Sequence, residues 1–304
     1  MKKIIVVAGP TAVGKTEYAI EIAKEFNGEI VSCDSMQLYK YMDIGSAKPT
    51  IEERAIVKHY LIDEIHPKEE FSVVDYQKRS KAAIDEIFSK GKTPIIAGGT
   101  GLYLNALLFD MDFGETKANH EYRNALYNIA ETQGNEALHK LLKDKSEEIA
   151  ERIHFNNVKR VVRALEAIEL KGEELKPFEN VKNRTTEYET CLICLTRNRE
   201  ELYDRINRRV DILLDQGLLE EVKGLIDMGF TSSDISMKGI GYKEIISFYN
   251  NEITLDEAIE LVKRNSRRYA KRQLTWFKRY DDMKWFNLSE VGLKEVLSWL
   301  KINI

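Results

Sequence analysis

The residues from Gly9 to Thr16, "GPTAVGKT", restrict the possible folds of this chain more than its other features do. They match the phosphate-loop pattern G-x4-G-K-[ST]. The apolar run "KIIVVA" precedes them, and "KTEYAIEIAKEF", with helical periodicity, follows them. A phosphate loop requires this setting, because the backbone N–H groups at a helix N-terminus then surround the anion. The pattern predicts a buried parallel strand, a diphosphate-binding turn and a helix.

The residues of this loop have separate expected roles. Gly14 permits the tight turn that brings the backbone close to phosphate. Lys15 is expected to reach the terminal phosphate oxygens, and the Thr16 hydroxyl to bind Mg²⁺. The motif indicates a diphosphate or a larger ligand, but it does not identify a nucleotide. The residues predicted to bind the phosphates are Gly9, Pro10, Thr11, Ala12, Val13, Gly14, Lys15 and Thr16.

Apolar runs alternate with helical segments in the first part of the chain. "GEIVSCDS" and "TPIIAGG" have the character of buried strands, and residues 72–90 between them have helical periodicity. This alternation predicts an α/β fold, a P-loop NTPase-like parallel sheet flanked by helices. Residues 113–189 have few β-branched runs and are expected to form an all-helical insertion domain. The core domain would then comprise residues 1–112 and 190–304.

The composition favours a cytoplasmic protein. Three cysteines, Cys33, Cys191 and Cys194, are too few for a disulfide framework and fit a reducing compartment. Cys191 and Cys194 have C-x-x-C spacing, but they lie in "YETCLICL", so we expect a buried structural role in preference to a metal or redox role. The five histidines have no zinc-binding spacing. The first apolar run is too short for a signal peptide, and no window is long enough to span a membrane.

Asp34 is the acidic residue that most needs an explanation. Kinases and ATPases with a phosphate loop need an acid at the end of a strand to hold Mg²⁺. The strand "TPIIAGGTG" ends in glycines, whereas "EIVSCDSMQLY" ends in Asp34, next to Ser35 and Gln37. Asp34 is therefore either a Mg²⁺ ligand or a general base placed for a substrate amine, and the pattern alone leaves both open.

A series of further motifs resembles one family, the bacterial tRNA dimethylallyltransferases, also called tRNA isopentenyltransferases. The resemblance runs from about residue 4 to residue 279. Small departures are Val13 for a common Ser, Ser46 for a common Thr, Phe155 for a common Pro, and "KHYLID" for a common HHLID. The motifs, in chain order, are "GPTAVGKT", "DSMQLY", "DIGSAKP", "HYLID", "FSVVDY", "GGTGLYL", "ERIHFNNVKRVVRALE", "RINRRVD", "GLLEEV", "GIGYKE" and "RRYAKRQLTWF".

The resemblance implies a reaction in which no phosphoryl group moves. Such enzymes transfer a dimethylallyl group from dimethylallyl diphosphate to N6 of the adenine that follows the anticodon, at tRNA position 37. The loop would hold the leaving diphosphate with Mg²⁺, and Arg197 would contact it. Asp34 would be the general base that takes the amine proton. Thr100 would lie near the reacting centre, and the adenine site would be lined by Ser35, Met36 and Gln37.

Two basic regions are expected to bind tRNA. The first is the stretch 263–279, at the end of the helix predicted from Thr254 to about Lys278; it has eight Lys or Arg and no acid, although the net charge of the chain is −4. Within it, Tyr269 and Trp276 are either base-stacking residues or, as is commoner, core residues. In the insertion, the resemblance assigns RNA contact to Arg123, Lys159, Arg160, Val161, Val162 and Arg163.

Three other functions are compatible with parts of the sequence. A small-molecule kinase would use the loop but leaves the basic helix unexplained. An adenylate isopentenyltransferase would use the same donor on free AMP and would need neither the insertion nor the basic helix. A non-catalytic RNA-binding module is disfavoured by the intact loop and Asp34. We expect a monomer without membrane attachment.

Overall fold

The computed structural model describes residues 2–111, 119–171 and 184–304 of the chain. It divides into two compact units. The first comprises Met1–Leu108 and Thr185–Ile304, and the second is Phe109–Arg184. The boundaries expected from the sequence, at residues 112/113 and 189/190, lie a few residues later in both cases.

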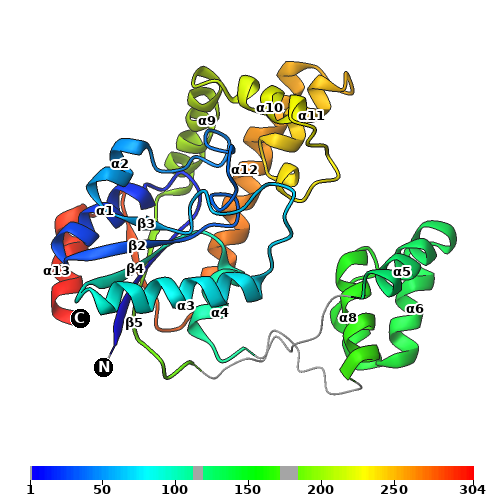
Figure 1. Ribbon diagram of the computed structural model, residues 1–304, viewed down its shortest axis with the longest axis horizontal. Coiled ribbons are helices and arrows are strands. Elements are labelled where there is room, and N and C mark those ends of the chain that lie inside the picture. The colour runs from blue at the N-terminus through cyan, green and yellow to red at the C-terminus, as the bar shows by residue number, and fades with distance from the viewer. Residues whose placement is uncertain (1, 112–118, 172–183) are drawn as a thin grey trace. The chain divides into compact units, whose positions relative to one another are not determined.

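A six-stranded, wholly parallel sheet forms the centre of the first unit, in the order β3-β2-β4-β1-β5-β6 (Figure 1). The central strands are buried on both faces, which explains their continuous apolar sequences. The predicted α/β fold is therefore confirmed. The strands are β1 (Lys3–Ala8), β2 (Gly28–Cys33), β3 (His59–Tyr60), β4 (Thr93–Gly98), β5 (Glu189–Thr196) and β6 (Lys284–Asn287).

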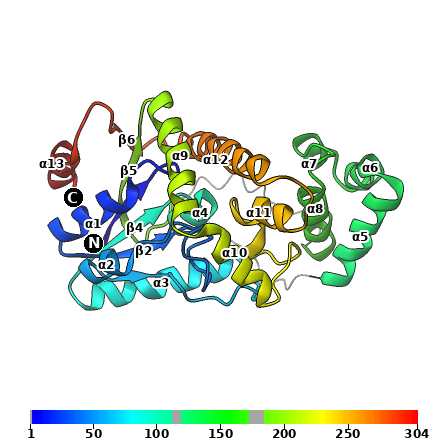
Figure 2. The same cartoon turned by 90° about the horizontal axis from the view of Figure 1, so that it is seen from above.

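Helices cover the sheet and continue beyond it as a packed group formed by α9 to α12 (Figure 2). The predicted long helix is α12 (Leu255–Phe277), and the Thr254 hydroxyl accepts the Glu257 N–H at its start, as the capping box requires. The other helices of this unit are α1 (Lys15–Glu25), α2 (Ile51–Ile56), α3 (Val73–Ser89), α4 (Gly101–Leu108), α9 (Arg199–Asp215), α10 (Leu218–Asp227), the short 3-10 helix η1 (Ser236–Lys238), α11 (Tyr242–Tyr249) and α13 (Leu293–Asn303).

The second unit is helical in its described residues, with its own core. Its helices are α5 (His120–Gln133), α6 (Asn135–Lys145), α7 (Glu147–Arg152) and α8 (Val158–Lys171). Val161 and Val162 are fully buried in this core, so their predicted contact with tRNA is wrong. The reason is the amphipathic pattern of α8, which turns both valines inward while Lys159, Arg160 and Arg163 remain exposed.

The two cysteines of the C-x-x-C spacing lie on β5. Residues three apart on a strand point to opposite faces, so Cys191 and Cys194 cannot hold one metal ion together. Burial raises the pKa of the Cys191 thiol to about 11, and that of Cys194 further, which keeps both thiols protonated. Among the described helices, none is both long and apolar enough to cross a membrane.

Candidate active site

The phosphate loop joins β1 to α1, and its backbone has the conformation that the motif predicts. Gly14 precedes α1 with φ 109°, a value that favours glycine, and Ala12 also has positive φ, at 62°. A Cβ at Gly9 would lie 2.7 Å from the Leu195 carbonyl oxygen, so the loop packs directly on β5. Because all the strands are parallel, the residues that follow β1, β2, β4 and β5 meet at one edge of the sheet.

Lys15 points its amine back into the loop, where Nζ donates to the Pro10 carbonyl at 2.8 Å. Loss of solvent around this amine lowers its pKa to about 8, and the neighbouring Asp34 carboxylate offsets only part of that effect. A phosphate anion at the loop would stabilise the charged form. The desolvated Lys15 amine therefore favours an anionic ligand, and no residue of the loop supplies that negative charge.

The pKa of Lys15 predicts how diphosphate affinity depends on pH. Below about pH 8 the amine is charged, and above it the amine must take up a proton when the anion binds. The contribution of Lys15 to affinity should therefore be flat below this value and fall up to about tenfold per pH unit above it. Calorimetric titration with diphosphate and Mg²⁺ at about pH 9, in two buffers of different ionisation enthalpy, should show proton uptake. Lys15→Arg, which stays charged, should abolish the uptake; equal uptake in both proteins would exclude Lys15 as its source.

Two arginines of the neighbouring chain segment lie against the loop. Arg197 Nε donates to the Val13 carbonyl at 3.1 Å, and Arg205 Nε to the Ala12 carbonyl at 3.0 Å. A Cβ at Gly14 would lie within 4.0 Å of both guanidinium groups. Arg197, the predicted diphosphate ligand, also pairs with Glu201 at 2.5 Å. Sequence reasoning assigned no role to Arg205, although it lies in the quoted motif "RINRRVD".

Asp34 and Thr100 follow two neighbouring strands of the sheet, β2 and β4. Asp34 follows β2, and its Oδ1 accepts the Met36 N–H at 2.9 Å. Thr100 follows β4, the neighbour of β2, and its hydroxyl accepts the Ser35 N–H at 3.1 Å. These two hydrogen bonds stabilise the turn after β2 and hold the Asp34 carboxylate in a fixed orientation.

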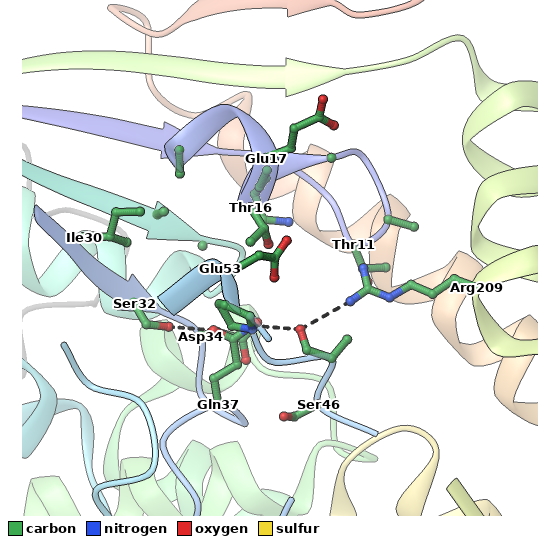
Figure 3. Close-up of a pocket in the computed structure, with 18 of the residues that line it drawn as sticks. Thr11, Thr16, Glu17, Ile30, Ser32, Asp34, Gln37, Ser46, Glu53 and Arg209 are labelled. Carbon is green, nitrogen blue, oxygen red and sulfur yellow. Dashed lines mark hydrogen bonds between the residues drawn. The ribbon is translucent and has the colours of Figure 1, made fainter. Parts of the chain in front are cut away.

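A hydrogen-bonded chain extends from Asp34's strand to helix α9 (Figure 3). The Ser32 hydroxyl donates to Gln37 Oε1 at 2.9 Å, and Gln37 Nε2 donates to the Ala47 carbonyl at 3.4 Å. Arg209 Nη2 donates to the same carbonyl at 3.5 Å. Burial lowers the pKa of Arg209, and the negative charge of Asp34 offsets part of this effect. Arg209 was missed at the sequence level, although Arg205 and Arg209 are spaced to share a helix face.

Two adjoining cavities meet at Asp34. One of about 470 Å³ includes Lys15 and Thr16, and the other, of about 350 Å³, includes Ser35 and Met36. Of the predicted donor residues, Gly14, Lys15 and Thr16 line only the first cavity. Of the predicted adenine residues, Ser35 and Met36 line only the second cavity, while Gln37 lines the first. Neither lining includes Thr100 or Arg197. The residues shared by both cavities are Thr11, Ala12, Asp34, Ser46, Ala47, Arg209 and Tyr269.

Helix α12 reaches the loop through Gln273, a residue that sequence reasoning missed. Gln273 is 5% exposed; its Oε1 accepts the Thr11 N–H at 2.9 Å, and its Nε2 donates to the Gly99 carbonyl at 3.0 Å. This amide fixes the loop to the residues that follow β4. Tyr269 lines both cavities, whereas Trp276 packs so tightly on Gly101 that a Cβ there would lie 2.2 Å from its ring. Trp276 is therefore a packing residue.

The basic residues of α12 divide between two faces. Lys263 pairs with Asp211 at 2.7 Å, and Arg267 donates to Asn207, so these two residues fix α12 to α9. Exposed cations at helical spacing include Arg264, Arg268 and Lys271 on α12 and Lys278, the residue that caps its C-terminus. We call these four residues the exposed basic face of α12. In the helical unit, Arg123 forms a bidentate pair with the buried Glu166, at 2.7 to 2.9 Å, which gives it a structural role.

Comparisons with known proteins identify the family. A family model described as IPP transferase matches residues 37–280. A tRNA dimethylallyltransferase from Clostridioides difficile is 53% identical over 292 residues, which cover 95% of this chain and 94% of that protein.

Solved structures agree in fold. The tRNA isopentenylpyrophosphate transferase from Bacillus halodurans is 43% identical, with a TM-score of 0.74 over 99% of this chain and 96% of that one. A eukaryotic dimethylallyltransferase acting on tRNA is 29% identical, with a TM-score of 0.83 over 99% of this chain and 78% of that one. The chain therefore belongs to the IPP transferase family, the family of the tRNA dimethylallyltransferases.

Proposed function

We propose that this protein transfers the dimethylallyl group of dimethylallyl diphosphate to N6 of adenine 37 in tRNA. The observation that carries this proposal is the position of Asp34 between two cavities, one of which contains the phosphate loop. A donor diphosphate fits the loop, and an acceptor amine in the second cavity would then lie on the other side of the carboxylate. The family relationship supplies the chemical identities of donor and acceptor.

The arrangement supports a direct substitution at the allylic carbon. The bond between that carbon and the diphosphate oxygen breaks, and a bond to N6 forms. The amine loses a proton as the new bond develops, and the Asp34 carboxylate accepts it. Negative charge grows on the leaving diphosphate, where the loop amides, Lys15 and Arg205 stabilise it.

Mg²⁺ fits this site as a metal held mainly by the diphosphate. The Thr16 hydroxyl lines the loop cavity, and an oxygen of this kind is a normal Mg²⁺ ligand. Within residues 2–111, 119–171 and 184–304, no group of three or more acidic, histidine or cysteine side chains could hold a metal ion. Mg²⁺ commonly binds one or two protein groups together with substrate phosphates. When bound, the ion neutralises charge on the leaving group, and Thr16 would hold it.

We propose that tRNA is bound by the exposed basic face of α12 and by Lys159, Arg160 and Arg163 of the helical unit. All of these side chains are exposed. An adenine must leave its stack to reach an enclosed pocket, and contacts to the RNA backbone have to compensate for that cost. The three free cysteines fit a reducing compartment, so a cytoplasmic location is part of the proposal.

The role of α12 gives a salt-dependent prediction. Changing Arg264, Arg268 and Lys271 together to Gln should weaken the binding of every tRNA, because phosphate contacts carry no sequence information. The slope of log affinity against log salt concentration should fall by about 0.7–0.9 for each phosphate that is no longer neutralised. A filter-binding titration over a range of KCl concentrations measures it. Lys2→Gln together with Lys24→Gln, at other exposed positions, is the control, and an unchanged slope in the triple variant would contradict the assignment.

One assay tests the proposed function against its alternatives. The protein is incubated with Mg²⁺ and dimethylallyl diphosphate together with unmodified tRNA or AMP, and separately with tRNA and ATP. Mass spectrometry of the nucleosides should show a gain of one dimethylallyl group on tRNA adenosine only. Modification of AMP would indicate an adenylate isopentenyltransferase, and phosphate release from ATP in step with turnover would indicate a kinase or ATPase. Binding of tRNA without any product would indicate an RNA-binding module.

A further inference from the structure

The segment 43–48 has an unusual backbone for a stretch that lines a site. Ser46 and Ala47 contribute to both cavities around Asp34. Ala47 has φ 47° and Tyr41, just before the segment, has φ 65°, although neither is glycine. Such conformations cost free energy and persist only where surrounding contacts fix them. The contacts that fix this segment are therefore informative about its role.

Glu221, on α10, makes the most concentrated set of these contacts. Its Oε2 accepts the N–H groups of Asp43 and Ile44, both at 2.7 Å, and its Oε1 accepts that of Gly45 at 2.9 Å. The hydroxyl of Tyr242 donates to Oε1 at 2.7 Å. Four donors occupy the acceptor capacity of one carboxylate. Three of them are consecutive backbone amides, so the carboxylate fixes the path of the segment and not merely one side chain.

Tyr242 adds a steric restraint to this carboxylate. It is 1% exposed, and a Cβ at Gly45 would lie 2.5 Å from its ring. The phenol thus lies directly against the Gly45 backbone while it donates to Glu221. Only a residue without a side chain can occupy position 45 in this arrangement.

The other end of the segment is held by a buried cation. The Lys48 side chain is 2% exposed, and its Nζ donates to the Tyr39 carbonyl at 2.6 Å and pairs with Asp43 at 2.7 Å and with Asp63. Residues 43–48 are therefore fixed by charged groups at both ends. The result is a defined position for the Ala47 carbonyl.

The Ala47 carbonyl links the segment to the catalytic centre. It accepts hydrogen bonds from Gln37, which follows Asp34 closely, and from Arg209. We infer that Glu221, assisted by Tyr242, is a positioning residue of the transfer reaction, which acts through residues 43–47 to orient Gln37 and Arg209 beside Asp34. This inference rests on the proposed function. It assigns a role to the motif "GLLEEV", which the reaction itself leaves unexplained.

Glu221→Gln tests the inference with a nearly isosteric change. One amide oxygen replaces two carboxylate oxygens, and the new NH₂ group faces backbone N–H groups whose hydrogen bonds it cannot accept. A shift of about 1 Å at reacting groups can lower turnover about a hundredfold, so we expect kcat to fall about tenfold to a hundredfold. The KM for tRNA should rise. The affinity for diphosphate should stay within about twofold, because Glu221 fixes residues 43–45 and not the loop that binds the diphosphate.

The experiment compares the wild type with four single variants and with two double variants, which combine Gln37→Ala with Glu221→Gln or with Tyr242→Phe. Glu220→Gln removes an exposed carboxylate from the same helix and should retain wild-type kinetics. Tyr242→Phe removes one of the four donors and should lower kcat less than Glu221→Gln does. In a double-mutant cycle, Glu221→Gln should lower kcat only slightly further when Gln37→Ala is already present, because both changes disturb the same hydrogen-bonded arrangement. Turnover is normalised to folded protein measured by thermal denaturation.

Each outcome separates positioning from a purely structural role. Kinetics of Glu221→Gln equal to those of Glu220→Gln, even with a lower Tm, would overturn the inference. So would effects that add fully to those of Gln37→Ala. If Glu221→Gln does not fold, a double-mutant cycle of Tyr242→Phe with Gln37→Ala replaces it. Fully additive effects on kcat in that cycle would again overturn the inference. Absence of prenyl transfer in wild type and Glu220→Gln would instead refute the proposed function and is therefore distinguishable.

Discussion

Asp34→Asn should lower kcat by about 10²- to 10⁴-fold, the range typical for removal of a general base. The change preserves the shape of the side chain and its acceptor for the Met36 N–H, but the amide cannot take the proton from the acceptor amine. Affinity for tRNA and for diphosphate should change much less, because neither depends on proton transfer. Steady-state turnover with saturating Mg²⁺, together with direct binding of both substrates, measures the difference.

The control for this prediction is a second acid of the same cavity. Glu17 is exposed and lines the cavity at the start of α1, so Glu17→Gln removes one negative charge without touching the junction of the two cavities. Its turnover should remain close to that of the wild type. Near-wild-type kcat in Asp34→Asn would show that the base assignment is wrong. Rescue of the activity by excess Mg²⁺ would instead make Asp34 a metal ligand.

Lys15→Ala should lower kcat/KM for the donor by about 10²- to 10³-fold, the effect of removing one preorganised donor from a developing anion. The amine is the loop's only side-chain cation, and its desolvated state already favours an anionic partner. Diphosphate affinity should fall as well, while tRNA affinity should not. Donor-dependent kinetics and calorimetric diphosphate binding measure both effects.

A lysine on the same helix provides the matched control. Lys24 lies in the last turn of α1 and pairs with Glu21 on the surface, so Lys24→Ala changes the net charge equally without reaching the loop. It should behave as the wild type does. If Lys15→Ala retains wild-type kcat/KM for the donor, the loop does not bind the diphosphate, and the site must be sought elsewhere in the two cavities.

Local sequence signals were sufficient for much of the fold. The phosphate loop, the apolar strands and the capping box at Thr254 each depend on contacts between residues close in the chain, and the structure contains them as predicted. The resemblance places Asp34 and Thr100 near one reacting centre, and these roles stay predictions. Their proximity follows from the parallel sheet, because the residues after neighbouring parallel strands must meet at one edge.

The wrong prediction of RNA contact concerns a helix that has one buried face and one exposed face. RNA contact was assigned to every residue from Lys159 to Arg163, although Val161 also belongs to an apolar stripe of the helix, and the helix turns Val161 and Val162 into the core. Arg123 forms an ion pair with the buried carboxylate of Glu166, and its contact with RNA stays a prediction. Burial depends on packing between helices, which the linear order does not specify.

What the sequence by itself determined was the phosphate loop between a strand and a helix, the parallel sheet, the family, and the nature of Asp34 as the acid at a strand end. Only the tertiary structure decided which distant residues support that centre. Gln273 reaches Thr11 across 262 residues of chain, and Glu221 reaches Asp43 across 178. Local propensity and periodicity are set by neighbours along the chain, whereas these hydrogen bonds exist only because packing of α9 to α12 brings remote polar groups to one edge of the sheet.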